Sequence, residues 1–300
     1  MKEMTTEELL KEIEENHNNS LFEEIFKRRD KELYRTALFY KGTKINYLTL
    51  KYNVIKYAKA LKAYGIKKGN EIPICMANTP EFIYLLGGIS LIGAKANIFG
   101  EGFDKDYITE IINGCNSDIL FATDDKYSAI DDSVKKSKNK RVVLISLTES
   151  LLNGKNPYIK LEKKWYDFKD RRNEIKDNSS RFMFSSEFLN LGKEYKGNYI
   201  EKVNLDDEFT ITYSSGSTNS SRPKAIVHDV KSYIVMGIYH DPKISKVPSM
   251  KNLRMLAHIP THSNTNIMSC ITDPLMQGSE IAVEPIYAPD HFVYSLLINK

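Results

Sequence analysis

The sequence has 300 residues, of which 41% are hydrophobic and 27% charged, proportions typical of an ordinary globular protein. Its 43 basic and 39 acidic residues nearly cancel to a formal charge of +4, so the balance gives no reason to expect nucleic acid as a partner. The longest apolar stretch, residues 82–94, is shorter than the roughly 20 residues of a membrane span, and we expect a buried helix there.

The cysteines and the N-terminus bear on the compartment. Cys75, Cys115 and Cys270 are far apart and show neither the paired spacing of a zinc site nor a disulfide framework. The first 17 residues are acidic and amphipathic, which is wrong for a secretion signal. We therefore expect a cytoplasmic protein with reduced, mostly buried thiols.

Strands and helices alternate through the first half of the chain. Apolar residues such as Leu50, Val54 and Leu61 recur on one helical face, and Gly65 follows as a helix stop. The expected order is a strand pair over 36–47, a helix over 48–64, a strand over 71–77, a helix over 80–93, a strand over 94–99, a helix over 104–115, a strand over 117–123, a helix over 128–137 and a strand over 141–147.

The regular alternation of strands and helices stops over 151–207, which we interpret as a variable surface excursion with one or two short helices. Alternation then resumes with strands over 208–213 and 224–228, a helix through 238, a strand over 252–259, a helix over 264–276, a strand over 280–286 and a final helix. This spacing predicts an α/β fold of stacked βαβ subdomains with largely parallel sheets. We expect one α/β subdomain over 1–205 and a second, containing the loop described next, over 206–300.

The stretch from Tyr213 to Asp229 reads "YSSGSTNSSRPKAIVHD". A glycine lets the backbone aim successive N–H groups at one point, and hydroxyls add donors that rotate toward phosphate oxygens. Lys224, beside the rigid Pro223, can bring a positive charge to the same anion. The combination of residue types suits a polyphosphate.

Three other interpretations compete. An NTPase P-loop needs a second glycine directly before its lysine, and none precedes Lys224. Ser221 and Lys224 have the Ser-x-x-Lys spacing of penicillin-binding enzymes, but Pro223 disfavours the helical turn that this chemistry needs, and the companion motifs are absent. The third is a Ser/Gly connection without chemistry.

The stretch resembles the phosphate-binding signature of the AMP-forming acyl-adenylating superfamily, which includes acyl-CoA synthetases. The matching residues are Tyr213, Ser214, Ser215, Gly216, Ser217, Thr218, Pro223, Lys224, Val227 and His228. The chain departs from the signature in having four residues rather than two between Thr218 and Pro223, and Ala225 in place of a glycine. The resemblance implies that Ser214, Ser215, Gly216, Ser217, Thr218 and Lys224 hold ATP phosphates.

The resemblance extends over most of the chain. Residues 37–99, with an Asn-x-x-Glu-Phe helix start at Asn78, look like the N-terminal block of the superfamily, and residues 256–283 look like the segment that follows the loop. A Pro-x-x-His run there helps line the acyl pocket, which implies that role for His262, although His262 follows Pro260 by only two residues. His258 and His262 also have the i, i+4 spacing of a helical zinc pair, but Pro260 lies between them.

Motifs that the superfamily uses for adenine, ribose and magnesium, Tyr-Gly-x-Thr-Glu and Thr-Gly-Asp, do not occur in the sequence, nor does the C-terminal lid domain with its lysine. We therefore expect an incomplete large domain, an N-terminal fragment of an ATP-dependent carboxylate-activating ligase that is inactive alone. The resemblance implies a carboxylic acid and ATP as substrates, Mg²⁺ as cofactor and coenzyme A as the usual acceptor. The alternative is a shortened, non-catalytic homologue that acts as a binding or interaction module. The acid, the oligomeric state, and whether the acceptor is coenzyme A or a carrier-protein thiol are not readable from the sequence.

Overall fold

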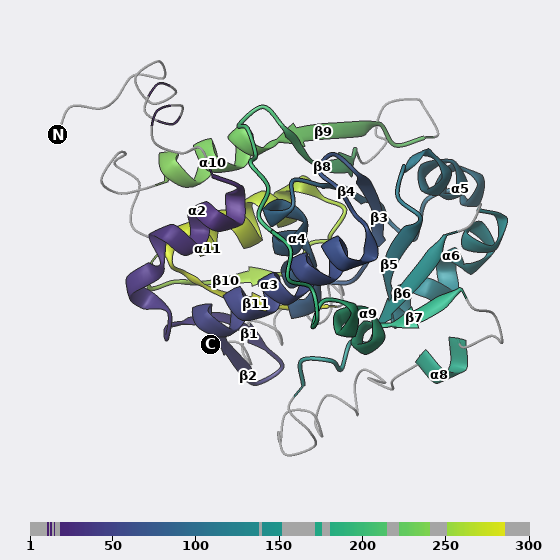
Figure 1. Ribbon diagram of the computed structural model, residues 1–300, viewed down its shortest axis with the longest axis horizontal. Helices are drawn as coiled ribbons and strands as arrows, with labels where there is room; N and C mark the ends of the chain where they lie inside the picture. Colours follow the sequence, from purple (N-terminus) through teal and green to yellow (C-terminus); the bar gives the residue numbers. More distant parts are fainter. Residues whose placement is uncertain are drawn as a thin grey trace.

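Two β-sheets organise the chain in the computed structural model, which describes residues 11, 13, 15, 19–137, 140–151, 172–175, 181–214, 222–240 and 251–285 (Figure 1). One sheet has seven strands in the order β7-β6-β5-β3-β4-β8-β9, and the other has four in the order β10-β11-β1-β2. The α/β fold with largely parallel sheets is therefore confirmed.

The seven-stranded sheet is parallel except at one edge. Its strands are β3 (Glu71–Cys75), β4 (Lys95–Ile98), β5 (Ile119–Thr123), β6 (Arg141–Ile145), β7 (Phe182–Phe184), β8 (Glu208–Tyr213) and β9 (Ala225–Asp229). Only β8 and β9 pair antiparallel, with Tyr213 opposite Ala225. Parallel pairing aligns the carboxyl ends of the strands at one edge of the sheet, where loops from several strands converge.

The four-stranded sheet is assembled from distant parts of the chain. Its strands are β1 (Thr36–Tyr40), β2 (Thr43–Asn46), β10 (Arg254–Ala257) and β11 (Glu280–Val283). β1 pairs parallel with β11, placing Leu38 opposite Ile281, and antiparallel with β2. Each sheet draws strands from both sides of residue 205, and the expected division into subdomains at that residue stays a prediction.

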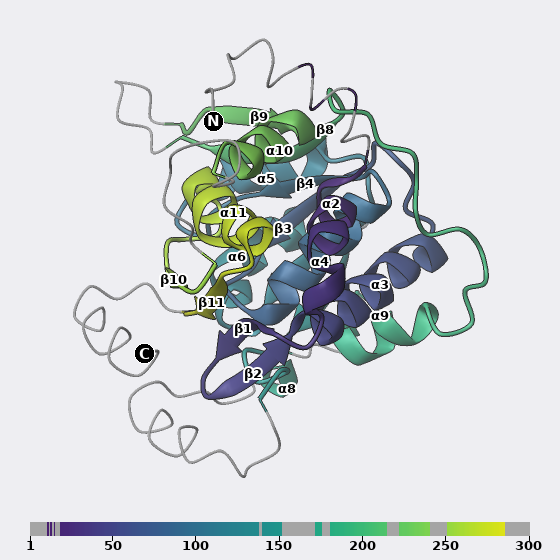
Figure 2. The same cartoon turned by 90° about the vertical axis from the view of Figure 1, so that its left-hand side faces the viewer.

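Helices fill the space between and around the sheets. They are α2 (Leu21–Arg28), α3 (Tyr47–Tyr64), α4 (Pro80–Leu91), α5 (Lys105–Gly114), α6 (Asp124–Lys136), α8 (Arg172–Ile175), α9 (Ser185–Leu191), α10 (Val230–Tyr239), the π-helix η2 (Asn266–Thr272) and α11 (Asp273–Gln277), with the short 3-10 turn η1 (Asp30–Glu32). One apolar core joins α3 and α4 to strands of both sheets, and a second lies under α5 and α6 (Figures 1 and 2).

Helix α3 follows from its local sequence. The Asn46 side chain accepts a hydrogen bond from the Thr49 N–H and caps the start, while Gly65 ends the helix in the left-handed region at φ 105°. Helix α4 begins with Pro80 in its first turn, after the N-cap Thr79, and is buried over its whole length. Both helices confirm the prediction, including the buried helix expected over 82–94.

Three elements differ from the prediction. Helix α6 begins at Asp124, four residues earlier than expected. Its first turn was not predicted because its polar residues show no helical spacing of apolar side chains. The three-residue β7, within the region interpreted as a surface excursion, extends the large sheet beside β6. The helix expected over 264–276 is largely a π-helix before α11, and the expected final helix lies outside the described residues.

The described residues also bear on the cysteine and membrane expectations. Cys75, Cys115 and Cys270 are buried and unbridged, as expected. No helix in the described part of the chain is both long enough and apolar enough to cross a membrane.

Candidate functional site

The β8–β9 hairpin brings Ser214 and Lys224 together at its loop end, just beyond the pair of Tyr213 and Ala225. The Ser214 N–H donates to the Lys224 carbonyl over 3.0 Å, and the Lys224 N–H donates to Ser214 Oγ over 3.0 Å. Lys224 is exposed, and Ser214 is half-buried. Of the other residues predicted to hold phosphate, Ser215, Gly216, Ser217 and Thr218 lie outside the described residues. The structure therefore fixes the two ends of the predicted phosphate loop.

Helix α5 supports the hairpin from one side. The Tyr107 O–H donates to the Pro223 carbonyl over 2.7 Å, and the Arg222 guanidinium lies 5.4 Å from the Tyr107 ring centre. Arg222 also pairs with Glu110 of α5 at 2.8 Å, although both side chains are about half exposed and the pair adds little stability. The residues just before Lys224 are thus tied to a helix.

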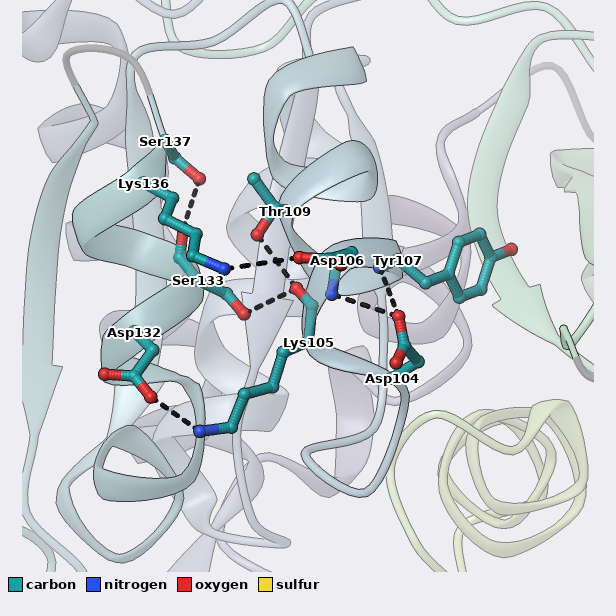
Figure 3. Close-up of polar contacts among 9 residues, drawn as sticks. All are labelled: Asp104, Lys105, Asp106, Tyr107, Thr109, Asp132, Ser133, Lys136 and Ser137. Atoms are coloured by element: carbon teal, nitrogen blue, oxygen red, sulfur yellow. Dashed lines mark hydrogen bonds and ion pairs between the residues drawn. The ribbon is translucent and has the colours of Figure 1, made fainter.

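Helix α5 itself is anchored at its first turn, as Figure 3 shows. Asp104 accepts hydrogen bonds from the Asp106 and Tyr107 N–H groups and caps the helix. From α6, the Ser133 hydroxyl donates to the Lys105 carbonyl over 2.7 Å. In the same view the Tyr107 side chain points away from these α6 contacts, consistent with its bond to Pro223.

A layer of aromatic rings connects the hairpin to the rest of the sheet edge. The Phe103 ring lies 5.5 Å from the Tyr213 ring and 5.5 Å from the His262 ring, both edge-to-face. Tyr213 is fixed by its hydroxyl, which donates to Asn97 Oδ1 over 2.9 Å. His262 and the end of β8 therefore lie on either side of one phenylalanine.

His262 lies close to the backbone at Gly100. A Cβ atom at residue 100 would come within 2.9 Å of the imidazole, so only glycine leaves room for the ring there. Burial lowers the pKa of His262 below its ordinary value, because the charged form loses water. Near pH 7 the ring is therefore a neutral hydrogen-bonding group rather than a fixed positive charge.

A pocket of about 570 Å³ opens beside His262. Its lining comes from the carboxyl ends of β3 and β4, the first turn of α6, and the segments after β10 and β11. The lining residues include Asn78, Glu101, Phe103, Lys126, His258 and His262. Ligands of open α/β sheets bind at this edge, so this is the candidate substrate pocket.

Lys126 pairs with two carboxyl groups in the lining of this pocket, which we call the His262 pocket: Glu101, and Asp125 at the longer distance of 3.9 Å. Lys126 Nζ donates to Glu101 Oε1 over 2.5 Å. Burial alone would raise the pKa of Glu101, but the hydrogen bond and charge of Lys126 outweigh it, and the pKa is held below its ordinary value. Glu101 is therefore ionised near pH 7 and neutralised by its partner.

Hydrogen bonds join the ends of the two sheets behind the pocket. Thr261 Oγ1 donates to the Met76 carbonyl over 2.6 Å. The Asn78 amide donates to the Ile259 carbonyl over 2.7 Å and accepts from the Asn266 amide over 2.7 Å. These bonds hold the segment that carries His262 against the end of β3.

Sequence reasoning missed Asn78, Glu101 and Lys126 as pocket residues. Each lies shortly after the end of a predicted strand: Asn78 after β3, Glu101 after β4 and Lys126 after β5. The parallel order of these strands, applied to the sequence, would have grouped them, since the carboxyl ends of parallel strands meet at one edge.

Among the described residues, no group of three or more His, Cys, Asp or Glu side chains is placed to hold a metal ion.

Comparisons with known proteins agree with this geometry. The 3-hydroxypropionyl-coenzyme A synthetase of Sulfurisphaera tokodaii is 29% identical over 212 residues, which are 67% of this chain and 29% of that protein. The acetyl-coenzyme A synthetase of Methylocella silvestris is 26% identical over 216 residues, 67% of this chain and 30% of that protein. The chain thus spans less than a third of the length of these relatives.

A solved structure shows the same fold. The N-terminal domain of FACL13 from Mycobacterium tuberculosis superposes with a TM-score of 0.66 at 16% identity, over 93% of this chain and 60% of that one. The expectation of an incomplete large domain of an adenylating enzyme agrees with that overlap. A family model described as AMP-binding enzyme matches residues 26–297. With nearly the whole sequence matched, the chain belongs to the family of AMP-binding enzymes.

Proposed function

We propose that this chain forms the phosphate-holding and substrate-binding part of an ATP-dependent ligase that activates a carboxylic acid and transfers the acyl group to coenzyme A. The observation that carries the proposal is the pair of hydrogen bonds between Ser214 and Lys224 at the loop end of the β8–β9 hairpin. Family membership and the relatives' names support the reaction class.

The loop end of the hairpin carries a hydroxyl and an ammonium group that can bind the β- and γ-phosphates of ATP. Because Ser214 Oγ accepts the Lys224 N–H, the hydroxyl hydrogen of Ser214 is directed elsewhere and can be donated to a phosphate oxygen. The Lys224 side chain is exposed and carries three N–H donors on a flexible stem. Charge-assisted bonds from this lysine would hold the phosphates that leave as pyrophosphate.

The His262 pocket would hold the acid. It is separated from the hairpin by one aromatic layer, the Phe103 ring. The neutral imidazole of His262 can donate one hydrogen bond to a carboxylate without a competing charge. Lys126 lies in the same lining, where it is paired with Glu101.

The reaction has two steps. A carboxylate oxygen of the acid attacks the α-phosphorus of ATP, the bond from that phosphorus to the bridging oxygen breaks, and pyrophosphate leaves with the electron pair, giving acyl-AMP. The thiol sulfur of coenzyme A, after losing its proton, then attacks the acyl carbon, and AMP leaves. Holding the β,γ-phosphates and the acid in line for the first step is the contribution we assign to these residues.

For the acid we propose a short aliphatic carboxylate. The relatives named above are synthetases of acetyl- and 3-hydroxypropionyl-coenzyme A, which carry two- and three-carbon acyl groups. Both match about two thirds of this chain, 67% in each case. Comparing acids of different chain length in one assay can test this assignment directly.

The test is carboxylate-dependent exchange of labelled pyrophosphate into ATP by the natural polypeptide that carries residues 1–300. We expect exchange to require an added acid and to be fastest with acids of two to four carbons. Exchange that is fastest with aromatic or long-chain acids would reject the short-chain assignment. Nucleotide binding without exchange with any acid would reject the ligase and favour the non-catalytic binding module.

A further inference from the structure

A second cavity, of about 490 Å³, lies between α3, the start of α4, the segment after β6 and α9. Its lining includes Thr43, Tyr57, Glu81, Tyr84, Glu149 and Ser150, and none of its lining residues belongs to the His262 pocket. We call it the Glu81 pocket. Nothing in the proposed ligase reaction uses it.

Three residues of this lining each carry a buried oxygen atom with no hydrogen-bond partner among the described residues: Thr43 Oγ1, Tyr57 OH and Glu81 Oε2. Their side chains belong to residues that are 5%, 2% and 5% exposed. Buried polar groups in proteins are nearly always paired, because an unpaired one has lost its water without replacement. Three such atoms on one cavity point to a ligand that supplies donors.

The charge of the cavity specifies the kind of donor. Glu149 is engaged by Arg172 at 2.7 Å and by the Ser185 hydroxyl. The Ser150 hydroxyl donates to Glu81 Oε1 over 2.5 Å, hydrogen bonds from Ser150, the Glu81 backbone and Thr79 lower the pKa of Glu81, and no cation is among the groups that act on it. Glu81 is therefore a buried carboxyl group whose charge is not balanced by the described residues that surround it.

Other charged and titratable groups face Glu81 from each neighbouring element. They are Tyr57 of α3, Tyr84 of α4, Glu149 after β6, and the exposed Lys44 of β2 at the edge of the cavity. The Tyr57 and Tyr84 rings lie 6.3 Å apart. A carboxylate beside tyrosine rings is a combination that recognises ammonium groups, through ion pairing and cation–π attraction.

We propose that the Glu81 pocket binds a small primary ammonium compound, whose N–H groups are accepted by Glu81 Oε2, Tyr57 OH and Thr43 Oγ1. A primary ammonium carries three N–H donors, as many as the unpaired oxygens of this lining. A quaternary ammonium would leave all three without a donor. Burial raises the pKa of Glu81 to about 7, so an ammonium ligand would also stabilise the ionised carboxylate.

The experiment is isothermal titration of the natural polypeptide carrying residues 1–300 with butylammonium chloride at pH 8, without ATP or acid. We expect saturable binding that is about tenfold or more tighter than that of 1-butanol, since the neutral alcohol lacks the charge-assisted bonds. Tetramethylammonium, a cation without N–H donors, should bind more weakly than butylammonium. Equal binding of these compounds, or no saturable binding of butylammonium, would overturn the proposal.

Two variants assign the binding to this cavity. Glu81→Gln keeps the shape and removes the charge, and should weaken butylammonium binding about tenfold or more. Tyr57→Phe removes one acceptor and should give a smaller loss, and it serves as the test if the first variant does not fold. Glu194→Gln changes an exposed carboxylate and is the matched control. Unchanged affinity in both pocket variants would contradict the proposal while leaving the ligase reaction untouched.

Discussion

The two pockets treat a carboxyl group in opposite ways. In the His262 pocket, Glu101 is paired with Lys126 and its pKa lies below the ordinary value. In the Glu81 pocket, burial raises the pKa of Glu81 to about 7, and no ion pair joins this carboxyl group to a cation in the described part of the chain. Burial raises the pKa of both groups, and at the partly exposed Glu101 the hydrogen bond and charge of Lys126 reverse that effect.

The largest expected effect comes from removing the unbalanced charge with Glu81→Gln. Burial raises the pKa from 4.5 to about 7, so the folded chain holds this proton more tightly than the unfolded chain. The resulting stabilisation is complete below pH 4.5 and is lost as the pH rises to about 7. At pH 8 the variant should exceed the parent in free energy of unfolding by up to about 3 kcal/mol, with little difference at pH 4.5.

Urea unfolding of both proteins between pH 4.5 and pH 8 measures this difference. Glu194→Gln, at an exposed site, should show no such pH-dependent gain. If Glu81→Gln is no more stable than the parent at pH 8, then Glu81 is balanced by a group that the described residues do not include, and the contrast between the pockets fails.

The converse change, Lys126→Met, should turn Glu101 into a second unbalanced carboxyl group. Its folded pKa, now below the ordinary value, should rise above it because burial is then unopposed. The pair is partly exposed, with side chains 24% and 36% accessible, so the loss of stability at pH 8 should be modest, about 1–2 kcal/mol.

This loss should shrink as the pH falls through the ordinary pKa range of a glutamate. The lowered pKa of Glu101 in the parent stabilises the folded state above that range, and this contribution disappears as the carboxylate is protonated. Urea unfolding at pH 8 and pH 4 measures both values. An equal loss at the two pH values would mean that the lysine acts by packing alone.

The smallest expected effect tests the support of the hairpin. Tyr107→Phe removes the bond to the Pro223 carbonyl and should cost about 1 kcal/mol, seen as a several-fold rise in the KM for ATP with the KM for the acid unchanged. Tyr195→Phe, which removes a local bond to the Asn198 carbonyl, is the matched control. A rise in the acid KM instead would assign Tyr107 to the His262 pocket.

Local sequence signals predicted most of the fold. Helix α3 was readable because its apolar spacing and the Gly65 stop agree with each other. β7 was not, because a three-residue strand carries too little pattern and forms only by pairing with β6. Local patterns are weak wherever pairing with a distant strand decides the structure.

The candidate site was predictable to the extent that it is continuous in sequence. The hydroxyl residues and Lys224 of the loop indicated a phosphate site, whose role in holding phosphate stays a prediction, and the resemblance pointed to His262. Glu101 and Lys126 escaped prediction because they meet only after β4 and β5 take their places in the sheet. The same holds for Thr43, Tyr57 and Glu81, whose missing partners exist only as a property of the folded cavity.

The central claim is that Lys224 holds the phosphates of ATP. Its most direct test is steady-state kinetics of Lys224→Ala in the natural polypeptide that carries residues 1–300, with Lys196→Ala, an exposed lysine before β8, as control. We predict that kcat/KM for ATP falls about ten- to a hundredfold, while the KM for the acid stays within a few-fold. An unchanged KM and kcat for ATP would contradict the claim, and the longer loop between Thr218 and Pro223 would then keep this lysine from the phosphates.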